Sequence, residues 1–145
     1  MLKIEGLLLK DIEQIHDIEC ACFSTPWSIN TLMEDLSNSA AKYIVLKEDD
    51  EVLGYLGVRM VLDELHIMNV AVKPDKRGKG YANIIMDELM TFAVQGDYKI
   101  ITLEVRESNQ VAMNLYLKFG FERCGMRRDY YEKPKENAVL MVKYM

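Results

Sequence analysis

The stretch from residue 65 to residue 92 constrains the fold of this chain more than any other. An apolar strand pattern, Leu65 to Val72, ends in a Pro74-Asp75 turn, and a basic segment with two glycines follows. A helical pattern then begins at Ala82. A strand, a glycine loop and a helix in this order predict an anion site, because the first N–H groups of a helix are unpaired and its dipole favours negative charge.

The loop itself combines backbone freedom with positive charge. Gly78 and Gly80 allow close approach of the backbone to a ligand, and Arg77 and Lys79 add charge. A Walker loop would need Ser or Thr after Lys79, and a dinucleotide-binding loop would need a third glycine where Asn83 stands. We therefore expect a phosphate or pyrophosphate of another kind of ligand here. The alternative is a solvated turn of charged residues.

Composition and length predict a single globular domain over residues 1–145. Half of the residues are hydrophobic and 28% are charged, which is ordinary for a domain with its own core. No apolar run reaches the length of a membrane span and no signal-peptide pattern is present, so we expect a cytoplasmic protein without membrane contact. The net charge of −5 disfavours direct binding to nucleic acid. The three cysteines lack a second cluster at zinc spacing, and no metal site is predicted.

Hydrophobic periodicity predicts an α/β fold. Strands are expected over residues 3–9, 43–47, 52–61, 65–72, 99–105, 121–127 and 137–144, and helices over 11–22, 29–36, 82–95 and 109–119. Asp11, Ser28 and Ser108 are the expected helix N-caps, and Gly96 the residue that ends the third helix. Short acidic turns between strands indicate an antiparallel meander in the first half, and the strand–helix–strand order of the second half implies a parallel crossover. The expected result is a mixed seven-stranded sheet with helices on both faces.

Candidates for proton transfer follow residue 100. Glu104 interrupts an apolar strand, so its carboxylate lies either at a cleft as a general base or at the surface against Arg106 or Lys99. Asn109 and Tyr116 stand two helical turns apart on one helix face. They are candidates for ligand binding and proton donation, or simply a first-turn residue and a core tyrosine.

Two stretches of the chain resemble the GCN5-related N-acetyltransferase (GNAT) superfamily. The first is Val70-Ala71-Val72-x-Pro74 followed by Arg77-x-x-Gly80-x-Ala82, which looks like the loop that binds the pyrophosphate of acyl-CoA. The second runs from Leu103-Glu104-Val105-Arg106 through Ser108-Asn109 and Leu115-Tyr116 to Phe119-Gly120-Phe121. Asn83 departs from the basic or small residue expected in the loop.

Further segments are similar to one branch of that superfamily, the bacterial enzymes that acetylate the N-terminal alanine of a small-subunit ribosomal protein. These segments are Phe23-x-x-Pro26-Trp27-Ser28, Val61-Leu62-Asp63-Glu64 and Arg127-Arg128-x-Tyr130-Tyr131. The resemblance implies the GNAT fold, acetyl-CoA as co-substrate and the N-terminus of a ribosomal protein or a similar peptide as acceptor. An α-amine also titrates about two to three units below a lysine, which makes it the easier acceptor at neutral pH.

The resemblance also assigns roles to residues. It implies that Glu104 accepts a proton and Tyr116 donates one, in a direct transfer within a ternary complex. The residues implied to bind acetyl-CoA are Val70, Ala71, Val72, Arg77, Gly78, Lys79, Gly80, Tyr81, Ala82, Asn83 and Asn109. Those implied to contact the peptide are Phe23, Pro26, Trp27, Tyr130 and Tyr131.

Acetyl-CoA binding along the 65–72 strand requires that strand and the next one to splay apart. A β-bulge near Met68-Asn69 would cause this, and it would leave a free strand edge to which the amides of pantetheine can pair. The N–H group of Val70 would then be placed to stabilise a tetrahedral oxyanion.

Two other functions stay open at this stage. A small-amine acetyltransferase would need an acidic pocket, to which Asp63 and Glu64 are possible contributors. A non-catalytic acetyl-CoA-binding module would not need both a proton acceptor and a proton donor. His66 is expected to be structural or at the surface, and Trp27 to be a hydrophobic staple or a substrate platform. We expect a monomer or a weak dimer.

Overall fold

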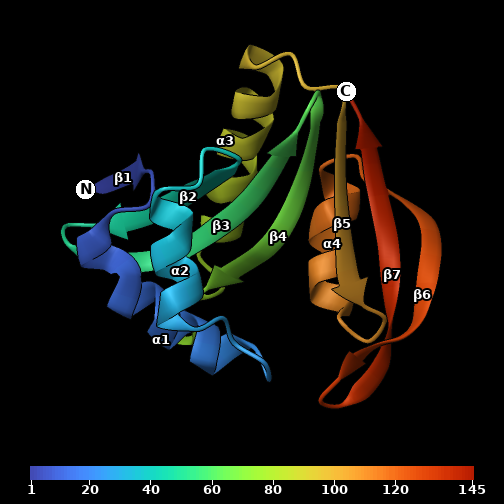
Figure 1. The fold of residues 1–145 in the computed structure, drawn as a ribbon, viewed down its shortest axis with the longest axis horizontal. Helices are drawn as coiled ribbons and strands as arrows, with labels where there is room; N and C mark the ends of the chain where they lie inside the picture. Colours follow the sequence, from blue (N-terminus) through green and yellow to red (C-terminus); the bar gives the residue numbers. More distant parts are fainter.

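A seven-stranded sheet in the order β1-β2-β3-β4-β5-β7-β6 organises the molecule (Figure 1). The computed structural model describes residues 1–145. The strands are β1 (Leu2–Glu5), β2 (Ala41–Glu48), β3 (Glu51–Val61), β4 (Glu64–Val72), β5 (Ile100–Arg106), β6 (Glu122–Glu132) and β7 (Lys135–Tyr144). The helices are α1 (Ile12–Cys22), α2 (Ile29–Leu36), α3 (Tyr81–Gln95) and α4 (Gln110–Lys118), with short 3-10 turns at Leu9–Asp11 and Pro74–Lys76.

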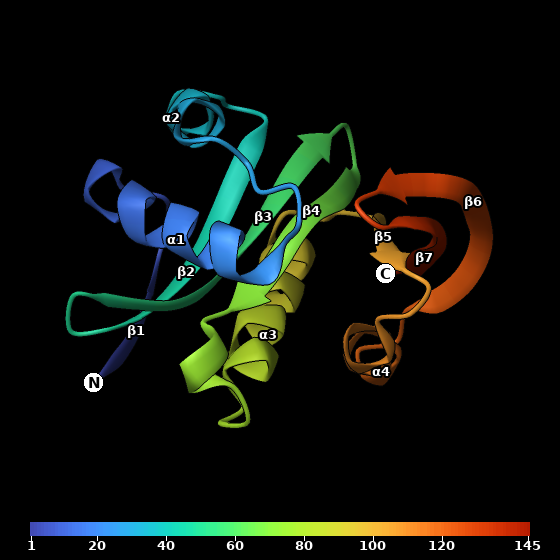
Figure 2. The ribbon, with the colours of Figure 1, turned by 90° about the horizontal axis from the view of Figure 1, so that it is seen from below.

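The helices cover both faces of the sheet, as the sequence predicted. Helices α1 and α2 lie on one face and α3 and α4 on the other (Figure 2). Every neighbouring pair of strands is antiparallel except β4 and β5, which are parallel and are joined through the crossover helix α3. None of the helices combines the length and the apolar character that crossing a membrane requires.

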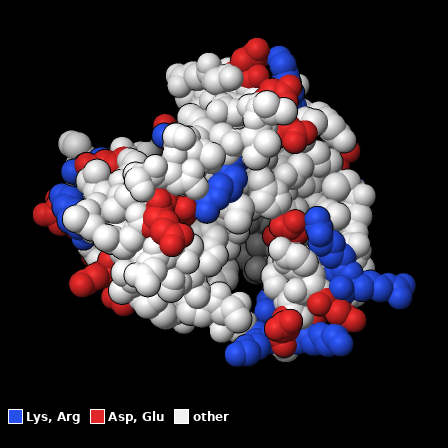
Figure 3. Space-filling view, in the orientation of Figure 1, with Lys and Arg blue, Asp and Glu red and all other residues white.

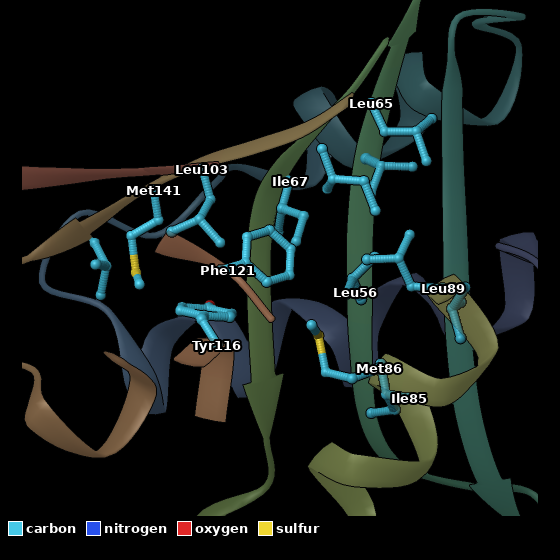
Figure 4. Close-up of a cluster of buried hydrophobic side chains, with 14 of the residues drawn as sticks. Leu56, Leu65, Ile67, Ile85, Met86, Leu89, Leu103, Tyr116, Phe121 and Met141 are labelled. Atoms are coloured by element: carbon cyan, nitrogen blue, oxygen red, sulfur yellow. The ribbon is translucent and has the colours of Figure 1, made fainter. Parts of the chain in front are cut away.

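Two apolar cores fill the space between sheet and helices. The larger core joins Leu56 and Ile67 of the sheet to Met86 and Leu89 of α3 and to Tyr116 of α4 (Figure 4). The smaller core lies under α1 and α2. Because side chains alternate along a strand, every second residue of β5 faces the larger core, and the others, Ile100, Thr102, Glu104 and Arg106, face the opposite side of the sheet.

The strands β4 and β5 separate half-way along their length. They pair only where Glu64–Ile67 lies beside Ile100–Leu103. In the β3–β4 ladder, Val58 pairs with Ile67 but Gly57 pairs with Asn69, so Met68 is the extra residue of a bulge. The predicted bulge and splay are confirmed, and the rest of β4 has β3 as a neighbour on one side and no strand on the other.

The ends of several elements differ from the prediction. The first strand stops at Glu5 instead of residue 9, because residues Leu9–Asp11 form a 3-10 turn. Asp11 does not cap α1; its buried carboxylate forms an ion pair with the buried ammonium of Lys47. The local sequence around Asp11 predicts a helix cap, but the position of this carboxylate is determined by Lys47, which is distant in the sequence.

Two helix ends were also assigned to the wrong residue or the wrong cause. The N-cap of α4 is Asn109, not Ser108: its side chain accepts a hydrogen bond from the N–H of Ala112 at 3.1 Å. Gly96 does end α3, but its φ is −86°, and the left-handed residue is Asp97 with φ 55°. Glycine is needed at 96 for space, since a Cβ there would lie 2.5 Å from the ring of Tyr98. Ser28 caps α2 as predicted, accepting from the N–H of Thr31.

Candidate active site

A groove of about 630 Å³ follows the free edge of β4 and is bounded by the start of α3 and one face of α4. Figure 3 shows the surface hollowed between the β4 side of the molecule and the side formed by β5–β7 and α4. The groove is lined by Cys22, Phe23, Val70, Ala71, Val72, Lys76, Arg77, Gly78, Gly80, Tyr81, Ala82, Asn83, Asn109, Val111, Ala112, Leu115 and Tyr116. All the residues predicted to bind acetyl-CoA are in this set except Lys79.

The glycine loop forms one end of the groove. Gly78 and Gly80 have φ values of 79° and 80°, in the left-handed region that glycine adopts without strain. Gly80 is the N-cap of α3 and has no side chain to bond the first helical N–H groups. The first helical bond runs from Ile84 N–H to the carbonyl of Gly80, so the preceding N–H groups of the first turn stay available to an anion.

Arg77 has a different position from the one its charge suggests. Its Nε donates to the carbonyl of Val72 at 3.3 Å, and its Nη2 contacts Sγ of Cys22 at 3.1 Å. The guanidinium therefore joins the loop to the end of β4 and to α1, and contributes charge to the groove from its wall. Lys79 is exposed and does not line the groove.

Asn83 has a partner that the sequence did not predict. Nζ of Lys118, on α4, donates to Oδ1 of Asn83, on α3, at 2.9 Å. This contact links the two helices on either side of the groove. It also brings a positive charge to the first turn of α3, where Asn83 stands in place of the expected basic or small residue.

The opposite wall of the groove is α4. The cap bond of Asn109 uses its carbonyl oxygen and leaves its amide N–H groups free to donate to a ligand. Tyr116 is only 7% exposed and its ring packs 5.8 Å from that of Phe121 (Figure 4). Burial raises the pKa of Tyr116, so its phenol stays protonated at neutral pH. Tyr116 is thus both a core residue and a groove residue, and the two predicted alternatives coexist.

Glu104 lies on the other face of the sheet. Its side chain is 17% exposed, and Oε2 lies 3.1 Å from Nε2 of His66 on β4. Oε1 lies 3.8 Å from Nε of Arg127 on β6. The surface partners considered from the sequence are engaged elsewhere, because Arg106 pairs with Glu136 and Lys99 with Asp97.

A buried carboxylate organises the loop between α1 and α2. Glu19 is fully buried and accepts hydrogen bonds from the N–H of Trp27 at 2.8 Å, from Nδ2 of Asn69 at 2.8 Å, and from the hydroxyl of Tyr55. Burial raises the pKa of Glu19. Glu19 therefore fixes the Phe23–Ser28 loop to the bulged part of β4. The signal in the sequence was a glutamate at an apolar position of a helix.

The residues predicted to contact a peptide lie in two groups. In the α1–α2 loop, Phe23 lines the groove, Trp27 packs against the smaller core as a staple, and Pro26 is exposed. On β6, the rings of Tyr130 and Tyr131 meet edge to face at 5.0 Å between centroids.

Arg106 connects these two groups. Its guanidinium lies 4.3 Å from the ring centre of Tyr131, and Nη2 donates to Oγ of Ser24 at 3.3 Å. Further bonds run to the β6–β7 turn, at the carbonyls of Lys133 and Pro134. One arginine on β5 therefore ties the loop of the first half of the chain to the hairpin of the second.

Comparison with known proteins decides the family. Residues 12–121 match the sequence model described as the acetyltransferase (GNAT) family. The chain belongs to the GNAT family. This acetyltransferase is 35% identical over 147 residues to a Haemophilus ducreyi protein named [ribosomal protein bS18]-alanine N-acetyltransferase, covering 98% of this chain and 99% of that one. A Haemophilus influenzae protein of the same name is 35% identical over 140 residues, covering 93% of each chain.

A solved structure agrees with this assignment. The acetyltransferase superposes on the crystal structure of the ribosomal-protein-S18-alanine N-acetyltransferase from Escherichia coli with a TM-score of 0.91 and 27% identity, covering 99% of this chain and 94% of that one. The predicted family, fold and enzyme class are confirmed, and acetyl-CoA is the co-substrate. The sequence missed Cys22, Lys76, Val111, Ala112 and Leu115 as groove residues, although the last three share a helix face with Tyr116.

Proposed function

We propose that this acetyltransferase transfers the acetyl group of acetyl-CoA to the α-amino group of the N-terminal alanine of ribosomal protein bS18. The observation that carries the proposal is the free edge of β4 where β5 separates from it. The glycine loop and Tyr116 lie on one face of the sheet at this point, and Glu104 lies on the other. A thioester lying along the edge can meet an amine that arrives from the Glu104 side. The choice of substrate follows the names of the relatives.

Each proton in the reaction has a residue to move it. Glu104 accepts a proton from the incoming ammonium, and the amine nitrogen then attacks the thioester carbonyl. The N–H group of Val70 stabilises the oxyanion of the tetrahedral intermediate. As the C–S bond breaks, Tyr116 donates its proton to the departing thiolate. The raised pKa of Tyr116 suits this donor role, because the residue is protonated when the reaction needs it.

The acceptor peptide is proposed to lie over the Glu104 face. The α1–α2 loop and the tyrosines of β6 flank this face, and Arg106 holds the two together through Ser24 and Tyr131. The N-terminal residue would enter toward Glu104, and the following residues would pass between Phe23 and Tyr131.

The small-amine alternative has less support. Asp63 and Glu64 were candidates for a polycation pocket, but neither lines the groove. Glu64 pairs with Ile100 at the closed end of the β4–β5 contact, away from the splay. The non-catalytic alternative does not account for the carboxylate of Glu104 and the protonated phenol of Tyr116 at the splay.

The deciding experiment is the initial rate with acetyl-CoA and a short peptide that begins Ala-Arg. The comparison substrate is the same peptide with a blocked N-terminus and a free internal lysine, and spermidine is the small-amine control. We expect turnover only on the peptide with a free α-amine. In a second assay with bS18 as the acceptor, we expect mass spectrometry to detect acetylation of its N-terminus. Turnover confined to the blocked peptide or to spermidine would overturn the proposal.

A further inference from the structure

The group that faces Glu104 across the β4–β5 contact is a histidine held at both ring nitrogens. Nδ1 of His66 lies 2.7 Å from Oγ1 of Thr102, and Nε2 lies 3.1 Å from Oε2 of Glu104. His66 and Thr102 are register partners in the parallel pair, so two neighbouring strands fix the ring. The histidine side chain is 33% exposed and the glutamate 17%, which places the contact at the edge of solvent.

The donors and acceptors of this chain of contacts determine its protonation. An ionised carboxylate only accepts hydrogen bonds, so Nε2 of His66 must carry a proton when Glu104 is charged. In the neutral ring, Nδ1 is then the acceptor, and the Thr102 hydroxyl donates to it. The carboxylate therefore selects the tautomer that presents an N–H to it, and the threonine hydroxyl, which can donate or accept, donates to the other ring nitrogen.

We infer that His66 is a positioning residue of the acetyl transfer, which holds Oε2 of Glu104 and leaves Oε1 to receive the proton of the amine. This inference rests on the proposed function and assigns a role to a side chain that the sequence alone placed among structural residues. A donor at one oxygen fixes the rotation of the carboxylate, and a base must be held in hydrogen-bond reach of its proton to be effective.

The other groups around the carboxylate do not duplicate this role. From β6, Arg127 lies 3.8 Å from Oε1, beyond hydrogen-bond distance, and its side chain is 58% exposed. Tyr131 of β6 faces the same carboxylate, and its pKa is raised to about 12, mainly by burial, so it is neutral in the working range. On β7 the register partner of Glu104 is Leu140. His66 is therefore the one titratable neighbour in hydrogen-bond contact with Glu104.

The first test measures the tautomer and does not depend on any substrate. The chain has two histidines, so the ¹⁵N resonances of His66 and His16 are assigned with one variant, His66→Gln. We expect the Nε2–H tautomer for neutral His66 in the wild type and in Thr102→Val, and a mixture of tautomers in Glu104→Gln, whose amide can donate or accept. A predominant Nδ1–H tautomer in the wild type would overturn the inference, whether or not the protein acetylates the Ala-Arg peptide.

The second test measures kinetics with the acceptor that the wild type uses. We expect His66→Leu to lower kcat by about 10- to 100-fold, the range for losing a hydrogen bond to a charged group, with the KM for acetyl-CoA unchanged. His66→Gln, whose amide can donate, should recover part of the rate.

Glu104→Gln supplies the control for a merely structural role. In that background, His66→Leu should have little further effect, since the residue it positions is already disabled. Equal effects of His66→Leu in both backgrounds, or no recovery of rate in His66→Gln, would remove His66 from the mechanism. If the wild type turns over spermidine and not the peptide, the proposed acceptor is wrong, and the same variants then test His66 with spermidine.

Discussion

The two faces of the sheet at the splay are built in different ways. On the α3–α4 face, most of the groove comes from one continuous segment, 70–83, with α4 as its other wall and with Cys22 and Phe23 completing it. On the α1–α2 face, the contacts are side-chain pairs between distant segments, such as His66 with Glu104 and Arg106 with Ser24. A ligand gripped by backbone N–H groups needs only a local motif. In an acceptor site that is assembled from side-chain pairs between distant segments, a substitution can alter one pair and leave the other pairs in place.

The largest effect should follow from removing the base. We expect Glu104→Gln to lower kcat by about 10²- to 10⁴-fold, the range for general-base catalysis, while the affinity for acetyl-CoA stays unchanged. Steady-state kinetics and calorimetric titration with acetyl-CoA measure the two quantities. Glu13→Gln, an exposed change on α1, is the matched control. A weakened affinity for acetyl-CoA would mean that the two faces are not independent.

Removing the proposed proton donor should have the next largest effect. We expect Tyr116→Phe to lower kcat by about 10²-fold, because the thiolate then leaves without a positioned acid. Binding of acetyl-CoA should be intact, since the ring still packs on Phe121. Tyr98→Phe, whose ring packs on Phe92, controls for the loss of a phenol elsewhere. Unchanged turnover in Tyr116→Phe would exclude the residue from proton transfer.

A change in the glycine loop should act on the co-substrate alone. A side chain at the left-handed φ of Gly80 costs about 1–2 kcal/mol. The free loop of Gly80→Ala can relax away from this φ, but the conformation that binds the anion cannot, so we expect the variant to bind acetyl-CoA about 5- to 30-fold more weakly. The KM for the peptide should not change. Gly6→Ala is the control, because Gly6 has open space around it and no left-handed φ. An equal loss of affinity in both variants would contradict the proposed anion site.

The smallest effect should come from the link between the loop and the hairpin. Ser24→Ala removes only the hydroxyl that Arg106 contacts, and we expect the KM for the peptide to rise about two- to fivefold. The kinetics with respect to acetyl-CoA should be unaffected. Ser37→Ala, which removes a hydroxyl bonded to the carbonyl of Glu34 on α2, is the control. A change in acetyl-CoA affinity would show that Arg106 acts across the sheet.

The same contrast explains what the sequence could predict. The glycine loop and the pair of Asn109 and Tyr116 on α4 follow from residues close to one another in the chain, and the β4 bulge follows from the ligand that the strand has to bind. The sequence did not predict the roles of Asp11, Glu19 and His66, because each is determined by a partner 36 or more residues away: Lys47, Tyr55 and Glu104 respectively. The packing of the sheet determines which side chains at that separation become partners, and the hydrophobic periodicity of the sequence does not predict them.

The extra residue at Met68 has a topological consequence. Before it, odd-numbered residues of β4 such as Leu65 and Ile67 face the larger core; after it, Ala71 faces the smaller one. One inserted residue thus reverses the phase of the strand and turns an interior strand into an edge without moving it to the outside of the sheet. Exposed edges invite other chains to pair with them. An edge enclosed between two halves of the same molecule admits a thin, linear ligand and excludes a second sheet.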